Sequence, residues 1–293
     1  RMTKWTLGII GGSGLYEIDG LEDKREERVQ TVWGEPSDTL VRGRVGPVGL
    51  VFLPRHGKGH RLTPTAVPYR ANIAALKAAG VTDILSISAC GSLKEQYVPG
   101  QFVAVDQFID RTVARESTFF GPGMVAHVSM ARPVCSRLST LAADAAEGVG
   151  AVTHRGGTYL AMEGPQFSSL AESRLYRQWG CDVIGMTAMP EAKLAREAEL
   201  PYATLAMVTD YDCWREEEEA VNVTNVLEIM GQNSALARQA VVRLAEMLAT
   251  IPRTPSPDGI DTCLDHALIT APTARDPAML TKLQVIAGRA LGG

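Results

Sequence analysis

The sequence predicts an α/β fold, a single domain with a central mixed β-sheet flanked by helices. The chain has 293 residues, of which 45% are hydrophobic and 21% charged, so it can bury a large core. Short apolar runs of strand type alternate with longer runs of helical period, which is typical of α/β proteins. No linker, repeat or low-complexity tract interrupts residues 5–250. We therefore expect one domain over residues 5–250 and a tail over residues 251–293.

The first half of the chain alternates predicted strands with one long helix. Apolar runs that end in glycine or in a polar turn indicate the strands, and apolar residues at helical spacing before Gly80 indicate the helix. In order, the predicted elements are a strand at residues 6–12 (TLGIIGG), a strand within residues 49–57 that ends at Arg55, a helix within residues 63–80, and strands at residues 81–93 and 101–111.

The second half continues the alternation and ends in a proline-rich tail. Ser169 and Glu172 have the spacing of a capping box, which predicts that a helix begins there. The apolar stripe of the last long helix is expected at Val226, Leu227, Met230, Val241, Leu244 and Leu248. In order, the predicted elements are a helix at residues 135–148, a strand at 156–165, a helix at 168–180, a strand at 181–187, a helix at 189–200, a strand at 201–212, a helix at 224–248, and a helical segment in the tail that packs on the domain or on a neighbouring subunit.

Composition excludes several classes of function. The formal net charge is −4, and no basic tract is interleaved with aromatic residues, so we expect no nucleic-acid partner. No apolar run approaches the ~18 residues that cross a bilayer, and residues 1–14 lack a signal-peptide cleavage pattern, so we expect no membrane association. Neither the five histidines nor the cysteines show metal-ligand spacing. The odd number of scattered cysteines predicts reduced thiols and a cytoplasmic protein, at Cys90, Cys135, Cys181, Cys213 and Cys263.

The glycine-rich turn after the first strand offers a first candidate anion site. Gly11-Gly12-Ser13-Gly14 does not complete the dinucleotide fingerprint, because position 17 is glutamate, and it lacks the lysine of a P-loop. Its backbone N–H groups and the Ser13 hydroxyl remain suited to an anion. A tight turn without a ligand explains the same residues equally well.

Polar residues also follow other predicted strands. Arg55 and His56 end the second strand, and an arginine fork matches phosphate oxygens, although a salt-bridged surface arginine is the simpler interpretation of this turn alone. Ser88 and Ala89 lie near the end of another strand, and Thr187 lies at the end of a third. Because ligand sites of α/β proteins lie at the carboxyl ends of strands, these residues together favour a phosphate site.

Asp210 and Asp212 follow the apolar run of residues 200–208. Two carboxylates at the end of a buried strand are costly unless a cation, a proton or a hydrogen-bond donor meets them. For this stretch alone, a loop pair capped by backbone N–H groups is a sufficient explanation. The phosphate-type residues upstream favour a functional role instead.

Seven stretches, taken in order, resemble the nucleoside phosphorylase family: GGSGL, RHG, SACGSL, QFIDRT, MEGPQFSS, GMTAMPEAKLAREA and TDYDCW. The resemblance covers roughly residues 7–248, and the match is closest to the branch that acts on 5′-methylthioadenosine. The resemblance implies phosphate-dependent cleavage of a nucleoside to a free base and a pentose 1-phosphate, in purine and methionine salvage. It also implies a single α/β domain, no metal or organic cofactor, inorganic phosphate as co-substrate, and a homotrimer or a dimer of trimers.

The resemblance also assigns roles to individual residues. It places Met186 against the ribose and Phe167 near the base or sugar, with Thr209 and Tyr211 among the substrate-binding residues. His127 would reach across a subunit interface to the 5′ substituent of a neighbour's substrate. The wall of the methylthio pocket would be Val223, Val226 and Leu227. The phosphate shell would be Ser13, Arg55, His56, Ser88, Ala89 and Thr187.

The implied chemistry assigns distinct roles to the two aspartates. Asp210 would protonate the leaving purine at N7, provided that burial raises its pKa toward neutrality. Asp212 would accept a hydrogen bond from the 6-amino group, or share in orienting the base, and the aspartate pair favours adenine over a 6-oxopurine. Which of the two aspartates holds the proton stays open at this point. The alternatives are a phosphorylase for 6-oxopurine nucleosides or methylthioinosine, which should carry Asn or a small residue in place of Asp210, a hydrolase that uses water, and a non-catalytic nucleoside-binding module.

Overall fold

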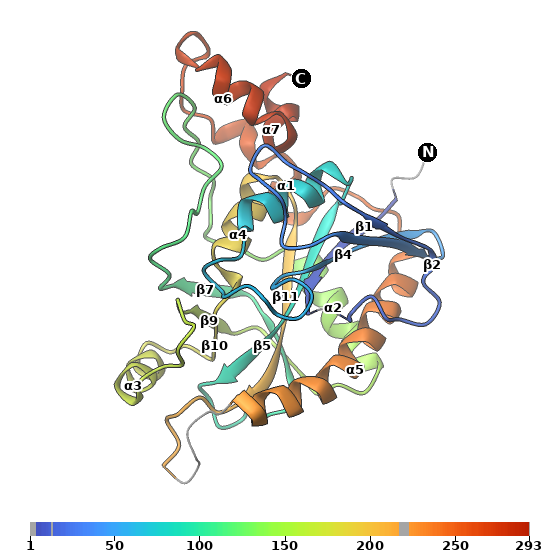
Figure 1. Cartoon of the computed structure of the whole chain (residues 1–293), viewed down its shortest axis with the longest axis vertical. Helices are drawn as coiled ribbons and strands as arrows, with labels where there is room; N and C mark the ends of the chain where they lie inside the picture. The colour runs from blue at the N-terminus through green and yellow to red at the C-terminus, as the bar shows by residue number, and fades with distance from the viewer. Residues whose placement is uncertain (1–3, 13, 217–222, 293) are drawn as a thin grey trace.

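A computed structural model describes residues 4–12, 14–216 and 223–292 (Figure 1). Eleven strands within these residues form one mixed sheet, and the main path through it runs β2-β3-β4-β1-β5-β10-β9-β7. This architecture confirms the predicted fold class. The strands are β1 (Thr6–Gly11), β2 (Glu22–Glu27), β3 (Leu40–Val45), β4 (Val48–Pro54), β5 (Asp83–Ser92), β6 (Phe102–Val105), β7 (Gln107–Asp110), β8 (Thr153–Arg155), β9 (Thr158–Ala161), β10 (Val183–Gly185) and β11 (Tyr202–Asp210).

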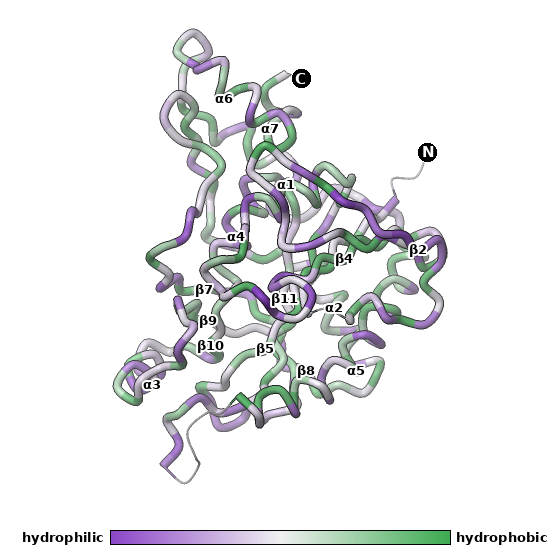
Figure 2. The backbone as a smooth tube through the Cα atoms, in the orientation of Figure 1, coloured by the Kyte–Doolittle hydropathy of each residue, from purple (hydrophilic) through white to green (hydrophobic). Residues whose placement is uncertain are grey.

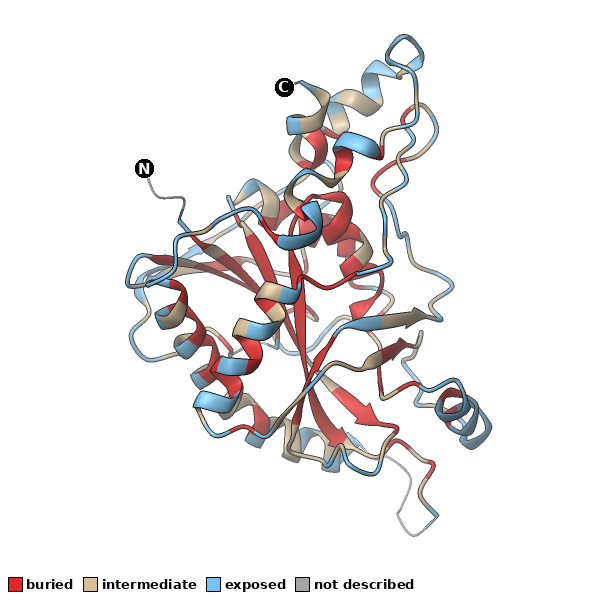
Figure 3. Ribbon diagram, turned by 180° about the vertical axis from the view of Figure 1, so that it is seen from behind, coloured by how far each residue is buried: buried red, intermediate tan, exposed pale blue. Residues whose placement is uncertain are grey.

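Helices cover both faces of this sheet. The strands separate two cores, since Ile9 of β1 packs in one apolar cluster and Ile10 in the other. Helices α2 and α5 cover the first cluster, and α1, α4 and the C-terminal helices cover the second (Figures 1 and 3). The helices are α1 (Tyr69–Ala78), α2 (Ser136–Gly148), α3 (Leu170–Gln178), α4 (Ala188–Glu197), α5 (Val223–Leu248), α6 (Pro277–Lys282) and α7 (Gln284–Leu291), with 3₁₀ segments η1 (Pro257–His266) and η2 (Pro272–Ala274).

The centre of the sheet is parallel and apolar. Strands β4, β1, β5 and β11 lie side by side in parallel, and Figure 2 shows hydrophobic residues concentrated along the chain through this region. Parallel strands that are buried on both faces are expected to be continuous apolar runs, which is how the sequence of β11 reads. Their carboxyl ends therefore open toward one edge of the sheet, where the polar turns follow.

The single strand predicted at residues 101–111 is wrong in one respect. The structure divides it at Asp106 into β6, which pairs with β11 and β8, and β7, which pairs with β9. Asp106 lies where the chain changes partners, and its carboxylate accepts the N–H of Gly157 at 3.0 Å. A polar residue with its own hydrogen-bond partner marks the break that the surrounding apolar residues conceal.

Three strands were not predicted. The hairpin of β2 and β3 forms one edge of the sheet, and its first strand, EDKREE, is almost entirely exposed. Charged edge strands avoid pairing with other chains, but they lack the alternation by which strands are recognised. The third, β8, has only three residues. The capping box at Ser169 and Glu172 is confirmed at the start of α3.

The segment after residue 250 packs against the rest of the chain. Leu264, Leu283 and Ile286 belong to the same apolar cluster as Ile73 of α1. Arg253 bonds Asp83 and Asp261 through two ion pairs of 2.6 Å each. Figure 1 shows α6 and α7 beside the long segment that follows β7. A bridge between Ala126 and Leu268 joins that segment to the chain between η1 and η2.

The predicted stripe of α5 holds for only part of the helix. Val241, Leu244 and Leu248 are buried, whereas Leu227 is 58% exposed. The first turns of α5 project beyond the body of the domain, so an apolar residue there has no core to face (Figure 1). None of the helices among the described residues is long and apolar enough to span a membrane.

Candidate active site

Strand β11 carries the aspartate stretch alongside β5, the strand that contains Ser88. β11 runs parallel to β5 with Ala206 opposite Ser88 and Met207 opposite Ala89. A bulge between Val208 and Asp210 then shifts the register, so that Asp210 faces Gly91. A Cβ atom at Gly91 would lie 2.9 Å from Oδ1 of Asp210. Glycine at this position therefore leaves room for the carboxylate.

Asp210 is a buried carboxyl group whose hydrogen bonds suit two protonation states. Its Oδ1 accepts the N–H of Asp212 at 2.8 Å, and its Oδ2 lies 2.6 Å from the hydroxyl of Thr209. That hydroxyl also lies 3.3 Å from the carbonyl of Cys90. Thr209 therefore donates to an ionised Asp210, or accepts from a protonated one while donating to Cys90.

Burial raises the pKa of Asp210 to about 6, and the nearby charge of Asp212 adds to the rise. The hydrogen bonds from Thr209 and from the Asp212 N–H act in the opposite direction but do not cancel it. A carboxyl group in this range can hold or release a proton near neutral pH. This is the property required of the predicted general acid.

Asp212 occupies a strained position and has an unsatisfied oxygen. Its backbone is left-handed, with φ of 54°, a conformation that aspartate tolerates better than most residues. Only 7% of the residue is exposed, and its Oδ2 makes no hydrogen bond within 3.5 Å to the described residues, although the hydroxyls of Ser168 and Ser173 are near enough to act on its pKa. Burial raises the pKa of Asp212 above its ordinary value. A buried acceptor without a partner fits a donor supplied by a ligand.

Aromatic residues hold the loop after Asp212 in place. The indole N–H of Trp214 donates to the carbonyl of Ser92 at 2.8 Å, and its ring meets the ring of Tyr211 edge-on at 6.0 Å. Tyr211 also donates to the carbonyl of Glu95 at 3.4 Å. Arg177 of α3 covers the other side of Trp214, with Cζ 3.6 Å from the ring centroid. The loop that carries both aspartates is therefore fixed to β5 and α3.

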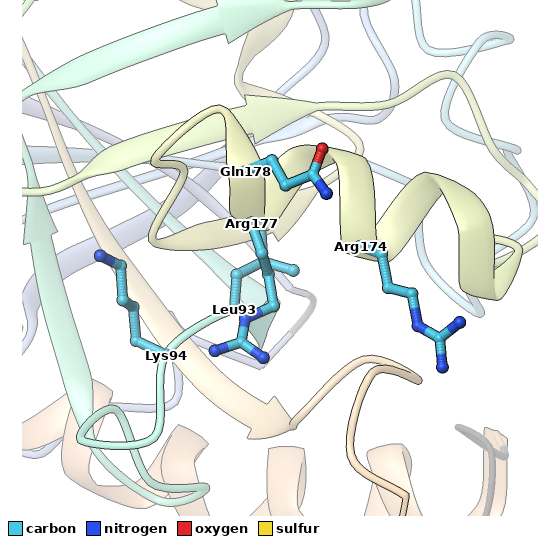
Figure 4. Close-up of a pocket in the computed structure, with 5 residues that line it drawn as sticks. All are labelled: Leu93, Lys94, Arg174, Arg177 and Gln178. Atoms are coloured by element: carbon cyan, nitrogen blue, oxygen red, sulfur yellow. The ribbon is translucent and has the colours of Figure 1, made fainter.

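An open basic hollow of about 380 Å³ lies next to this loop (Figure 4). Lys94 enters it from the turn after β5, and Arg174 and Arg177 enter it from α3. Each cation already has a neighbour, because Lys94 pairs with Asp182, Arg174 lies 4.0 Å from Glu216, and Arg177 covers Trp214. Neither aspartate of the candidate site lines this hollow.

Arg55 lies at the end of β4, but it is buried rather than at the surface. Only 2% of the residue is exposed, and Glu191 of α4 meets the guanidinium at 2.8 Å and 2.9 Å. Burial alone would lower the pKa of Arg55, yet the charge and hydrogen bonds of Glu191 outweigh it and raise this pKa. Nη2 also donates to the Ser86 hydroxyl at 2.6 Å. Among the residues that the structure describes, Nη1 has one acceptor for its two hydrogens, the carbonyl of Ile87 at 3.3 Å.

His56 is a neutral ring with a fixed tautomer. Its Nδ1 lies 2.9 Å from the carbonyl of Leu62, and because a carbonyl only accepts, Nδ1 carries the proton. Burial lowers the pKa of His56 to about 4, and the charge of Arg55 contributes to this. Its ring stacks on His60 with centroids 4.2 Å apart. In this state Nε2 is an acceptor.

The remaining phosphate candidates lie on neighbouring elements. Ser88 and Ala89 are half-buried on β5, beside β11. Thr187 is buried at the N-terminus of α4, where its N–H lies 3.4 Å from the hydroxyl of Tyr159. Ser13 lies outside the described residues. Thr187 follows β10, which runs antiparallel to β5 with Ile184 opposite Gly91, so the chain after β10 runs back toward Ser88 and Ala89. Arg55 contacts the same strand through its hydrogen bonds to Ser86 and Ile87.

Met186 and Phe167 belong to two loops in direct contact. Met186 packs on Gly164, where a Cβ atom would lie 2.5 Å from its sulfur, and the φ of Gly164 is +62°. Phe167, three residues further on, is 42% exposed. The glycine is required both by its backbone conformation and by the close approach of Met186.

The residues predicted to meet the 5′ group are not buried in this chain. His127 lies on the long segment after β7, where its N–H donates to the carbonyl of Ala267 at 2.9 Å. Val223 is 60% exposed and Leu227 58%, while Val226 is not fully buried either. The single chain therefore does not bring these four residues into its own core.

Sequence reasoning did not identify Glu191, which orients Arg55, or Gly91, which makes room for Asp210. Glu191 follows a proline in GMTAMPEAKLAREA, and the sequence of this helix does not indicate that the charge of Glu191 is buried. The described residues contain no group of three or more His, Cys, Asp or Glu side chains arranged to hold a metal ion. The chemistry available at this edge consists of two carboxyls, one guanidinium, hydroxyls and one imidazole.

Comparison with known proteins places this geometry in context. Residues 6–246 match the model of a family described as the phosphorylase superfamily. An S-methyl-5′-thioadenosine phosphorylase of Cereibacter sphaeroides is 59% identical over 290 residues, covering 99% of this chain and all of the relative. The enzyme of the same name from Bradyrhizobium diazoefficiens is 58% identical and matches over the full length of both chains.

Solved structures show the same similarity in three dimensions. The crystal structure of a methylthioadenosine phosphorylase from an Antarctic soil metagenomic library superposes with a TM-score of 0.91 at 46% identity, covering 97% of this chain and 99% of the other. The methylthioadenosine phosphorylase of Schistosoma mansoni, in complex with adenine, gives a TM-score of 0.79 at 42% identity, covering 84% of this chain and 92% of the other.

Proposed function

The chain belongs to the phosphorylase superfamily, and we propose that it cleaves 5′-methylthioadenosine with inorganic phosphate to adenine and 5-methylthioribose 1-phosphate. This makes it a pentosyltransferase. The observation that carries the proposal is the aspartate pair, in which a buried Asp210 has its pKa raised to about 6 and a buried Asp212 offers an unpaired oxygen. Its relatives by sequence and by structure carry the same activity in their names.

The reaction breaks the bond between C1′ of the sugar and N9 of the purine, and a phosphate oxygen forms the new bond to C1′. The sugar becomes cationic as the bond stretches, so a phosphate anion held beneath it stabilises the transition state. Electrons flow into the purine, and Asp210 donates its proton to N7 of the departing base. Solvent then returns a proton to Asp210.

Phosphate would be held by residues that follow β4 and β10 and by residues of β5. The second N–H of Arg55 Nη1, which has no acceptor among the described residues, would donate to one phosphate oxygen, while Glu191 holds the guanidinium in position. Thr187 and Ser88 would add hydroxyl donors, Ser13 a third, and the backbone near Ala89 an N–H. Nε2 of neutral His56, an acceptor, would accept the hydrogen of the remaining P–OH group of hydrogen phosphate. We assign no metal or organic cofactor to this reaction.

Base selection would depend on Asp212. An ionised carboxylate accepts from the 6-amino group of adenine, whereas the 6-oxo group of hypoxanthine is itself an acceptor and leaves a buried oxygen unpaired. Asp210 stands where a 6-oxopurine enzyme should carry Asn or a small residue, so the alternative of a methylthioinosine or purine nucleoside phosphorylase is disfavoured. Thr209 and Tyr211 would support this pair, with Met186 against the ribose and Phe167 near the base.

The 5′ pocket would be completed by a second subunit of a homotrimer, or of a dimer of trimers. Exposed Val223 and Leu227 would wall the methylthio group together with Val226, and His127 would reach a neighbour's substrate. Their exposure in the single chain supports this arrangement. The reaction would serve purine and methionine salvage in the cytoplasm, in keeping with the free cysteines of the described residues.

A phosphate-dependence assay tests this function. Turnover of methylthioadenosine, adenosine, methylthioinosine and inosine is measured with and without phosphate. We expect methylthioadenosine to be cleaved fastest and only with phosphate, and Asp210→Asn to lower its turnover by about 10²-fold or more, because general acid catalysis typically contributes that much. Cleavage without phosphate would indicate a hydrolase, and binding of adenine without any turnover would indicate a non-catalytic module. Faster cleavage of the inosines would contradict the adenine preference.

A further inference from the structure

Arg115, which no sequence motif singled out, is a buried hub between two loops of the candidate site. Only 1% of its side chain is exposed. On one side, Nε donates to the carboxylate of Glu163 at 2.9 Å and Nη2 donates to the Glu163 carbonyl at 2.8 Å. On the other side, Nη1 donates to the carbonyls of Met186 and Met189, the latter at 2.7 Å. One guanidinium therefore joins the loop after β9 to the turn after β10.

One side of this hub, the turn of residues 186–189, carries both the sugar candidate Met186 and the phosphate candidate Thr187, and the other side is the loop of Glu163 and Gly164. Met186 and Met189 bracket Thr187, the buried hydroxyl assigned to phosphate. The φ and ψ of Met189 are −122° and 134°, so the helical hydrogen bonds of α4 do not fix the carbonyls of this turn. Arg115 supplies the donors instead. Without it, both carbonyls lose a charged donor.

The carboxylate on the opposite side keeps the guanidinium in position. Glu163 accepts the N–H groups of Val113 at 2.5 Å and Ala114 at 3.0 Å, and the hydroxyl of Thr65. These hydrogen bonds and the charge of Arg115 outweigh its burial and lower the pKa of Glu163 to about 2. Glu163 directly precedes Gly164, on which Met186 packs. Tyr69 lies close by, its hydroxyl 3.1 Å from Nη1.

We propose that Arg115 is a positioning residue for the phosphorylase reaction, which holds the turn that carries the sugar contact Met186 and the phosphate hydroxyl of Thr187 in place against the loop of Glu163 and Gly164. The inference rests on the proposed function and deepens it. By contrast, Asp210 and Asp212, which would bind the base, lie at the end of β11 and just after it, and this stretch is held by Thr209 and Trp214 rather than by Arg115. Loss of Arg115 should therefore weaken phosphate use and turnover while adenine binding stays unchanged.

The test compares Arg115→Lys and Arg115→Met with wild type in three measurements: the KM for phosphate, kcat, and the Kd for adenine. Methionine keeps the bulk but removes every donor, and lysine keeps the charge but cannot span both sides. Because displacement of a reacting group by about 1 Å can cost 10²-fold, we expect the Met variant to raise the phosphate KM or lower kcat by at least about tenfold. The adenine Kd should change less than about twofold, and lysine should recover part of the loss.

Arg253→Met is the matched control. Arg253 is also a largely buried arginine that joins two segments, through Asp83 and Asp261, but it contacts neither loop of the site. It should lose thermal stability without a selective change in phosphate use. The inference is overturned if both Arg115 variants keep the wild-type phosphate KM and kcat. It is also overturned if the Arg115 variants weaken phosphate binding and adenine binding equally, and by no more than the control does. The phosphate dependence of the wild type, read in the same assay, reports separately on the proposed function.

Discussion

At the scale of the residue, the burial of Asp210 that would suit it to act as an acid also affects the stability of the fold. Below about pH 4 the carboxyl is protonated in both the folded and the unfolded chain. Between pH 4 and 6 only the folded chain retains the proton, since burial raises its pKa to about 6. The stability that this group contributes is therefore complete at low pH and is lost as the pH rises through 6. At neutral pH the fold carries a buried charge at a cost.

Asp210→Asn should remove that cost together with the activity. Each pKa unit corresponds to about 1.4 kcal/mol, so the difference in unfolding free energy between the variant and wild type should move in favour of the variant by roughly 2 kcal/mol between pH 4 and pH 7.5. Asp212 is present in both proteins and cancels to first order. Denaturant unfolding at both pH values measures this. An equal difference at the two would show that Asp210 titrates normally.

Glu191 is a second residue whose charge should strongly affect the unfolding free energy and the phosphate KM. It neutralises buried Arg55 and accepts the hydroxyl of Tyr202 at 2.9 Å. Glu191→Gln leaves the guanidinium charged and uncompensated, which typically costs about 3–5 kcal/mol of unfolding free energy. The phosphate KM should also rise, because Arg55 loses its fixed orientation. Phosphate kinetics that match wild type in a destabilised variant would restrict Glu191 to a structural role.

At the scale of the element, the approach of β11 to β5 determines where the carboxylate lies. Gly91→Ala places a Cβ atom 2.9 Å from Asp210 Oδ1 and 3.1 Å from Ile184 Cγ2. We expect turnover to fall by about tenfold or more, since the acid must shift. Gly231→Ala is the control, because nothing lies within 4 Å of its added Cβ in α5. It should keep full activity and gain about 1 kcal/mol of stability. Equal activities would mean that Asp210 tolerates the displacement.

The elements also show how far sequence reasoning reaches. Apolar runs that end in glycine or in polar turns predicted β1, β5 and β11, because a buried parallel strand needs that composition. Exposed β2 carries only charged residues, so no hydrophobic pattern marks it. The strand breaks at Asp106 because the chain before it pairs with β11 and β8 and the chain after it pairs with β9. That change of partners depends on the tertiary structure. The pair of Arg55 and Glu191 spans 136 residues, a proximity that no local pattern encodes.

At the scale of the whole molecule, the C-terminal segment closes one of the two cores. Ile286 is buried in the cluster that also contains Ile73 of α1. Ile286→Ala should lower the unfolding free energy by about 2–5 kcal/mol and leave a single cooperative transition, because the segment and the sheet share a core. Gln284→Ala, on the exposed side of the same helix, should change it by less than about 0.5 kcal/mol. Two separate transitions would show that the segment unfolds independently.

The left-handed backbone of Asp212 limits how this enzyme can diversify. Of the side chains available at a φ of 54°, only Gly, Asn and Asp adopt that conformation at little cost. In a saturation library at position 212 that is screened for folding alone, those three should be enriched, whereas position 211 should accept a broader set. In the role proposed for Asp212, recognition of the base would therefore be confined to a narrow set of residues, with few single-step routes to a new substrate through this position.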